Sequence, residues 1–209
     1  WSAVSGEAIL RMSPKDVAGS AHQFVRVFPD GGRIVTGVGV SQGKDAVIWN
    51  ATSGESLLEI SSRHMGFEPP VTMLELSPCG EMLVTTSRFW ALYWDTVNGH
   101  LQRATGANEG VITSVALSAH GRRAVLVRDC GALFINDLAL HPPLRMTVIG
   151  PGLHQAVMFP GGDRFVVYSS REAIIWEAGS LRKLHTLPGV QHLKRLVVSP
   201  DGALVAGCS

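Results

Sequence analysis

Two short phrases recur along this 209-residue chain, and an internal repeat limits the possible folds more than any other feature of a sequence. The first phrase is an apolar alternating stretch, a turn of the Pro-x-Gly type and a second apolar stretch, as in VRVFPDGGRIVTG and LVVSPDGALVAGC. The glycines of these turns follow one another at steps of 49, 41, 41 and 40 residues, and they are Gly31, Gly80, Gly121, Gly162 and Gly202.

The second phrase sets a tryptophan five residues before a glycine, as in VIWNATSG and LYWDTVNG. Asparagine replaces the tryptophan once, so that the equivalent positions along the chain are Trp1, Trp49, Trp94, Asn136 and Trp176. These positions follow at steps of 48, 45, 42 and 40 residues. Because both phrases keep nearly the same spacing, they belong to one repeated structural unit.

Each unit is predicted to contain four short strands. In the second complete unit we expect strands at residues 71–76, 82–86, 91–94 and 100–104, joined by turns in which proline fixes φ and glycine accepts positive φ. The second and third strands, such as 33–38 and 46–49, are largely apolar rather than alternating. Both of their faces are therefore expected to be covered. No segment has a helical period.

Four antiparallel strands repeated at this period are typical of a β-propeller blade, so we predict an all-β fold. The phrases FPDG, SPDG and YWD resemble those of WD40 repeats, and the resemblance extends over essentially the whole chain. It implies a propeller in which the third-strand tryptophans Trp49, Trp94 and Trp176 fill the gaps between blades. It implies no particular function.

The repeats depart from WD40 families in their buried polar groups. Those families join a histidine before the first strand, a hydroxyl on the second, an aspartate before the third and the tryptophan in one hydrogen-bonded tetrad. Here the histidine places fall near Ala18, Phe67, Asn108, Ile149 and Gly189, and the aspartate places near Gly43, Arg88, Cys130 and Ser170. Thr86 and Ser41 remain candidates for the hydroxyl, and Asp45 or Asp129 for the aspartate after a short shift. Since a half-satisfied buried network costs more than apolar packing, we expect hydrophobic groups between these divergent blades.

We divide the chain, residues 1–209, as one WD40-like propeller segment of about five blade equivalents. It consists of an outer half-blade at 1–13, complete blades at 21–60, 70–104, 111–149 and 153–187, and an inner half-blade at 190–209. The two half-blades either pair to close a small ring or are the cut edges of an arc from a ring of about seven blades. We favour the arc, because an unpaired sheet edge needs cover and a chain that begins with Trp1 is expected to continue upstream.

The composition limits the kinds of binding partner and the cellular compartment that we expect for this protein. The net charge is +1, from 18 basic and 17 acidic residues, which argues against nucleic acid as a partner. The cysteines Cys79, Cys130 and Cys208 are odd in number and lie outside any CxxC pattern, so we expect no disulfide framework and an intracellular, cytoplasmic location. No apolar run approaches the roughly 18 residues of a spanning helix, and membrane insertion is not expected.

The sequence offers little for catalysis or metal binding. None of the eight histidines has HxH, HxxxH or HExxH spacing. A propeller can still gather ligands at its axis, where we expect one side chain from each first strand, namely Arg26, Glu75, Ala116, Val157 and Val197. Only one of these is a carboxylate, so we predict no catalytic residues, metal or cofactor. GVGVSQGK and the Asp129–Gly131 stretch are interpreted as turns rather than a phosphate loop or a reactive thiol site.

Loops on the usual binding face of the family carry the most informative residues. Arginine and aromatic side chains dominate binding hot spots, and the candidates for partner binding are Arg63, His64, Phe67, Arg88, Phe89, Trp90 and Arg171. The alternative for Trp90 is that it packs under its own loop.

We predict a non-catalytic platform for protein or peptide partners, a scaffold within a larger multidomain protein. The alternative is a propeller enzyme of the lactonase or cofactor-dependent dehydrogenase type with an axial metal or cofactor, which a thermal shift on adding Ca²⁺ would favour.

Overall fold

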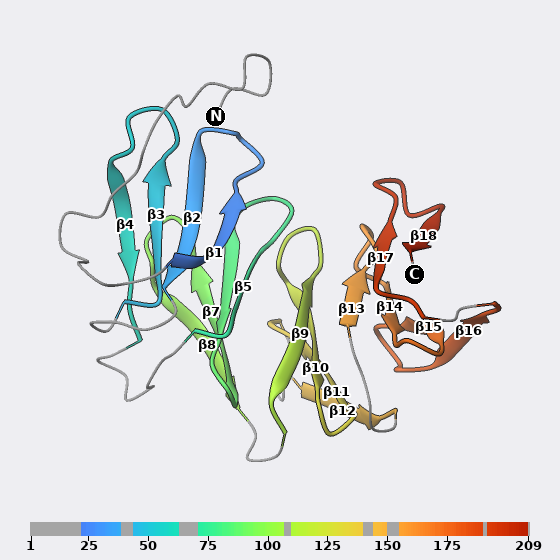
Figure 1. Ribbon diagram of the computed structural model, residues 1–209. Helices are drawn as coiled ribbons and strands as arrows, with labels where there is room; N and C mark the ends of the chain where they lie inside the picture. The colour runs from blue at the N-terminus through green and yellow to red at the C-terminus, as the bar shows by residue number, and fades with distance from the viewer. Residues whose placement is uncertain are drawn as a thin grey trace.

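The computed structural model describes residues 22–38, 44–62, 71–106, 110–139, 144–149, 155–189 and 192–208. In these residues all regular secondary structure is β-strand, which confirms the all-β prediction. The strands form four antiparallel sheets of four strands and one pair, each in chain order (Figure 1). A sheet of four consecutive strands needs only short turns, and the sequence supplies a turn phrase at each reversal.

The first two sheets consist of β1 (His22–Val27), β2 (Arg33–Val38), β3 (Ala46–Asn50), β4 (Ser56–Ile60), β5 (Met73–Leu76), β6 (Met82–Thr86), β7 (Trp90–Asp95) and β8 (Leu101–Gly106). The third and fourth sheets consist of β9 (Ile112–Leu117), β10 (Arg123–Arg128), β11 (Ala132–Asp137), β12 (Leu144–Val148), β13 (Gln155–Met158), β14 (Arg164–Tyr168), β15 (Ala173–Glu177) and β16 (Lys183–Leu187). The remaining pair is β17 (Arg195–Val198) and β18 (Val205–Cys208).

The turn between the first and second strands has the same geometry in all five units. Its glycine has φ between 66° and 79° and donates its N–H to the carbonyl three residues earlier, at 2.8–2.9 Å. This positive φ is the reason for glycine at Gly31, Gly80, Gly121, Gly162 and Gly202. The turn between the third and fourth strands also keeps its geometry when the glycine is lost. Leu181, five residues after Trp176, has φ 58° and donates to the Glu177 carbonyl at 2.9 Å.

The sheets pack face against face, and the alternation of each strand decides which neighbour a side chain meets. On β10, Ala124 and Leu126 join a buried cluster with the second sheet, whereas Val125 and Val127 join another with the fourth sheet. Similar clusters lie between the first and second sheets and between the fourth sheet and β17. Trp94, 1% exposed, lies in the cluster between the first two sheets, as expected for a ring that fills the gap.

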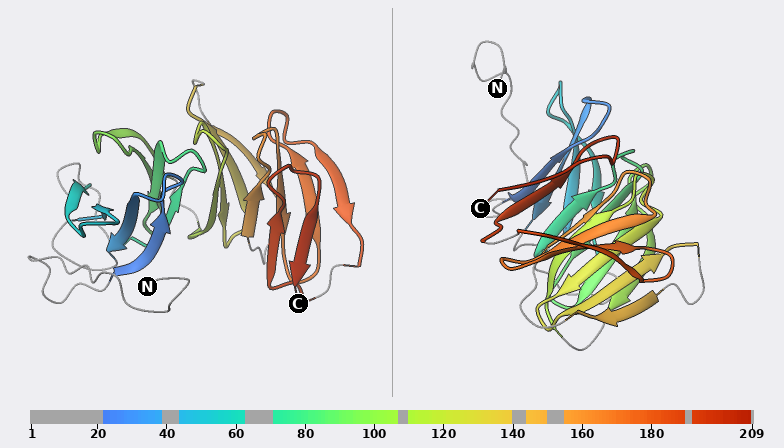
Figure 2. Two further views of the ribbon diagram at one scale, coloured as in Figure 1. Left: turned by 90° about the horizontal axis from the view of Figure 1, so that it is seen from above. Right: turned by 90° about the vertical axis from the view of Figure 1, so that its right-hand side faces the viewer.

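Consecutive sheets also meet through their first strands. Strand β1 contacts β5, β5 contacts β9, β9 contacts β13 and β13 contacts β17. The sheets therefore succeed one another along a curve, with the first sheet and the β17–β18 pair at its two ends (Figure 2). Apolar side chains are exposed at both ends of this curve: Val25, Val27, Val197 and Leu204.

The prediction that apolar groups replace the WD40 tetrad is wrong in the first two sheets, where the third-strand tryptophan keeps a hydroxyl partner on the second strand. Trp94 Nε1 donates to Thr85 Oγ1 at 2.8 Å, and Trp49 Nε1 donates to Thr36 Oγ1 at the same distance. The choice of Thr86 as the hydroxyl was therefore wrong by one residue, since Thr86 faces Thr72 instead, and Ser41 lies outside the described residues. At the equivalent hydroxyl position, the third and fourth sheets carry buried apolar residues, Leu126 and Val167.

The two candidate aspartates bind backbone rather than histidine. The carboxylate of Asp45 accepts the Ser62 N–H, and that of Asp129 accepts the Val111 N–H at 2.8 Å. Burial raises the pKa of Asp45, and the hydrogen bonds from Ser62 only partly oppose this. Asp45 therefore holds Ser62, just after β4, and Asp129 holds Val111, just before β9.

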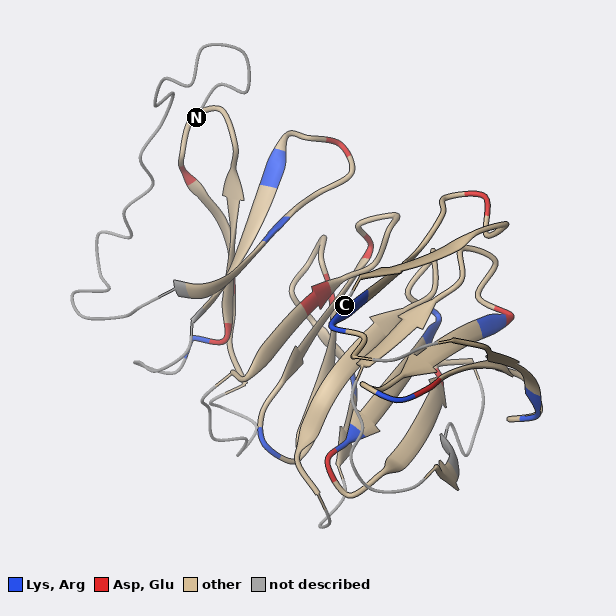
Figure 3. Ribbon diagram, turned by 45° about the vertical axis from the view of Figure 1, so that its right-hand side comes forward, with Lys and Arg blue, Asp and Glu red and all other residues tan. Residues whose placement is uncertain are grey.

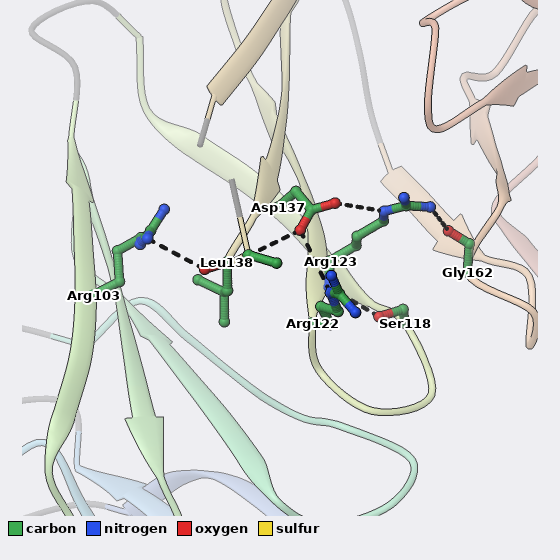
Figure 4. Close-up of polar contacts among 8 residues, drawn as sticks. Arg103, Ser118, Arg122, Arg123, Asp137, Leu138 and Gly162 are labelled. Carbon is green, nitrogen blue, oxygen red and sulfur yellow. Dashed lines mark hydrogen bonds and ion pairs between the residues drawn. The ribbon is translucent and has the colours of Figure 1, made fainter. Parts of the chain in front are cut away.

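Polar contacts link the second, third and fourth sheets (Figure 4). Arg103 on β8 donates to the Leu138 carbonyl of the third sheet at 3.4 Å. Arg123, the first residue of β10, donates to Asp137 Oδ2 at 3.0 Å and to the Gly162 carbonyl of the fourth sheet at 3.1 Å. Burial alone would raise the pKa of Asp137, but the hydrogen bond from Arg123 and the Ala139 N–H outweigh it and lower the pKa.

Alanine substitutions of two glycines at equivalent turns test the contact between the second and third sheets. A Cβ on Gly121 would lie 2.3 Å from Cβ of Met82, whereas a Cβ on Gly31 would meet nothing within 4 Å. Gly31→Ala should cost only the positive-φ penalty of about 1–2 kcal/mol, and Gly121→Ala should cost about 1–3 kcal/mol more through overpacking. Urea unfolding measures both, and equal losses would show that the turn does not pack against β6.

A second prediction concerns Asp137 and pH. Because its pKa is lowered in the folded protein, the ion pair with Arg123 stabilises at neutral pH and is lost as the pH falls through the folded pKa. Asp137→Asn should lower the free energy of unfolding by about 1.5–3 kcal/mol at pH 7, and the difference should shrink below about pH 3.9. Urea unfolding at several pH values measures this. The control is Asp163→Asn, an exposed partner of Arg164 at 3.7 Å, which should have little effect. A difference that does not change with pH would contradict the assignment.

Candidate functional site

The structure describes some of the residues that the sequence predicts for partner binding. Arg63, His64 and Phe67 lie outside the described residues. Arg88 and Phe89 form the turn between β6 and β7, and Trp90 begins β7 rather than lying in the loop as expected. Arg171 lies in the β14–β15 turn of the fourth sheet, and the third sheet lies between it and the β6–β7 turn in the order of contacts.

The β6–β7 turn and the first residue of β7, called here the Arg88–Trp90 loop, present two aromatic rings to solvent. Phe89 is 37% exposed and Trp90 40% exposed. The Arg88 guanidinium lies over the Phe89 ring, 5.2 Å from its centre, which is close enough for a cation–π contact. One cation and two rings on three consecutive residues make an amphipathic surface of the kind that dominates protein contacts.

Every carbonyl of this loop has a hydrogen-bond partner. The Arg88 carbonyl accepts the Ile112 N–H at 3.2 Å and the Trp90 carbonyl accepts the Ser87 N–H at 2.9 Å. The Phe89 carbonyl accepts a hydrogen bond from the guanidinium of Arg128 at 3.1 Å. Two of the three bonds come from the third sheet, so the loop is held at the junction of two sheets. A loop fixed before binding loses less entropy on binding.

Arg128, which the sequence reasoning missed, is the centre of this anchor. It is 2% exposed, donates to the Gly110 carbonyl at 2.7 Å and lies over the Phe134 ring at 5.0 Å. Burial lowers the pKa of its guanidinium, and the nearby Cys130 and Asp129 oppose this shift. The available signal was an arginine that ends the apolar stretch RAVLVR beside a turn, but the sequence does not show which carbonyls lie within its reach.

Trp90 has a structural role as well as an exposed face. It faces Gly106 across the β7–β8 pair, and a Cβ on Gly106 would lie 2.5 Å from Cε3 of the Trp90 ring. The ring therefore covers the backbone of a glycine that has no side chain of its own, a pairing known from β-sheet design. Truncation of Trp90 would change both packing and surface, so Arg88 and Phe89 are cleaner probes of binding.

A concave feature lies where the first strands meet. A hollow of about 610 Å³ is lined by residues from β1, β5, β9, β13 and β17. The lining includes one alternating residue from each of these strands: Arg26, Glu75, Ala116, Val157 and Val197. Arg26 Nη2 lies 2.8 Å from Glu75 Oε2, so the carboxylate expected at this axis forms an ion pair. Arg195 adds another positive charge to the lining.

Lys and Arg residues and Asp and Glu residues occur along the whole described part of the chain (Figure 3). No family model matches the sequence, and no curated protein matches it either. Among the described residues there is no helix of the length and apolar character needed to cross a bilayer.

The Arg128 anchor leads to a direct test. Arg128→Met keeps much of the side-chain volume but removes the hydrogen bonds to Gly110 and Phe89, and it should cost about 1.5–3 kcal/mol for bonds made by a charged donor. Hydrogen exchange at the Ser87 N–H, which closes the loop, should become faster. The control is Arg164→Met, another arginine over a phenylalanine ring (4.8 Å from Phe159) but on a different sheet. Unchanged exchange in Arg128→Met would show that the loop is held without this arginine.

Proposed function

We propose that the chain is a segment of a divergent WD40-like β-propeller that serves as a non-catalytic platform for protein or peptide partners. The blades are the four-stranded sheets, and the hollow between the first strands is the propeller axis. The segment is an arc of a larger ring rather than a closed ring of its own. In this account the β6–β7 loop is a partner-binding loop.

The propeller assignment is supported by the order of contacts between sheets. Each first strand contacts the first strand of the next unit, and all five first strands line one hollow. Sheets stacked in two layers would not bring five successive first strands around a common space. The arc is supported by the apolar side chains exposed on the first sheet and on the β17–β18 pair, because large exposed apolar patches commonly mark interfaces.

The single observation that carries the binding role is the Arg88–Trp90 loop. It combines exposed aromatic rings with a backbone whose carbonyls are all bonded. Exposed aromatic groups on a fixed backbone favour recognition of another protein, because little order is lost when the partner docks.

The test is capture of partners by the immobilised chain and by the double variant Arg88→Ala/Phe89→Ala, with the captured proteins quantified by mass spectrometry. Loss of a hot spot costs about 2 kcal/mol or more, so capture of the specific partners should fall roughly 30-fold. The matched control is Val97→Ala, an exposed apolar residue (79%) in the turn after β7, at the other end of that strand. Equal capture by the double variant and the wild type would contradict the proposal.

A further inference from the structure

Three side chains with metal-binding atoms meet at the junction of the second and third sheets. The Sγ of Cys79, a carboxylate oxygen of Glu81 and an imidazole nitrogen of His120 all lie within 4.8 Å of one another. Cys79 and Glu81 lie in the turn between β5 and β6, and His120 lies in the turn between β9 and β10. Cys79 and Glu81 are two residues apart, but His120 lies about 40 residues farther along the chain, so no local motif indicates the complete set.

The backbone holds these two turns together without any help from the three side chains. The Cys79 N–H donates to the Ala119 carbonyl at 2.9 Å, next to His120. Gly121 approaches Met82 so closely that a Cβ there would overlap the methionine side chain. The cluster is therefore built on two turns with fixed positions, and only side-chain rotation is needed to bring its atoms closer.

A thiolate, an imidazole and a carboxylate are the three ligand types that Zn²⁺ accepts in proteins. Ca²⁺ and Mg²⁺ prefer ligand sets made of oxygen atoms, which this cluster does not offer. Ligand bonds of 2.0–2.3 Å in a tetrahedral site place the ligand atoms roughly 3.5 Å apart. The exposed side chains of Glu81 and His120 can close the remaining gap by changing rotamer.

We propose that Cys79, Glu81 and His120 form a zinc site that clamps the second sheet to the third. The chain supplies three ligands, and water completes the tetrahedron. The Ser77 hydroxyl, 3.4 Å from Cys79 Sγ, is placed to hydrogen-bond to the thiolate, and outer-shell partners of this kind strengthen metal sites. Because the bound ion would bridge two sheets, it stabilises the packing of one sheet on the next.

This site is separate from the proposed partner-binding loop. Glu81 precedes β6 and Ser87 follows it, so the metal ligands and the Arg88–Trp90 loop lie at opposite ends of the same strand. Partner capture and zinc binding can therefore fail independently of each other.

The first experiment is calorimetric titration of the chain, freed of metal and kept reduced, with ZnCl₂. We expect one tight site, and Cys79→Ser and His120→Gln should each weaken it by at least about 10-fold, the loss that even an outer-shell change produces. Saturating Zn²⁺ should also raise the thermal midpoint of the wild type by several degrees, because it binds the folded chain. The controls are Cys208→Ser and His185→Gln, exposed residues outside the cluster, which should leave the affinity unchanged.

The second measurement identifies the ligands by spectroscopy. Co²⁺ bound in place of Zn²⁺ should show a thiolate-to-metal absorption band, which Cys79→Ser abolishes and Cys208→Ser retains. The thermal midpoint of each variant without metal checks that it is folded, and Glu81→Gln provides a third ligand variant should either of the others be unstable. The proposal is overturned if the wild type takes up no Zn²⁺, or if the folded ligand variants bind it as tightly as the wild type. It is also overturned if the cobalt band depends on Cys208 rather than Cys79.

Discussion

The fold depends on covering both faces of each internal sheet. A four-stranded sheet with apolar side chains on both faces cannot exclude water from either face by itself. The third sheet meets this requirement by packing Ala124 and Leu126 toward the second sheet and Val125 and Val127 toward the fourth. Since each sheet needs a neighbour on both sides, the sheets form a series, and the ends of the series retain exposed apolar groups such as Val27 and Leu204.

Face-to-face packing also determines where the polar and functional groups lie. The second and third strands are largely apolar and buried, and the candidate sites lie at the turns at the two ends of the sheets and in the hollow between first strands. Arg128 belongs to a strand, and it ends β10 where its guanidinium reaches the carbonyls of Gly110 and Phe89. At the opposite end of the sheets, the turns that carry Cys79 and His120 are joined by a backbone hydrogen bond. In both places, the contact between neighbouring sheets creates the site.

The repeated units could be predicted because their determinants are local. A glycine that must adopt positive φ, such as Gly80, and a tryptophan at the end of a third strand, such as Trp94, mark the turn and strand wherever they occur. The partner of each side chain could not be predicted, because it depends on the register of the strands. Thr85 rather than Thr86 accepts the bond from Trp94, and a shift of one residue reverses the face of a strand. For the same reason the sequence did not reveal Arg128 or the cluster of Cys79, Glu81 and His120, which depend on contacts between two units.

The most direct test is methyl NOE spectroscopy of the chain labelled at Ile, Leu and Val. Val125 and Leu126 are adjacent on β10 and buried on opposite faces. Beyond their own sheet, the methyl groups of Leu126 should show cross-peaks only to the second sheet, and those of Val125 only to the fourth. Cross-peaks from both residues to one and the same sheet would contradict the serial packing on which the fold, the hollow between the first strands and both proposed sites depend.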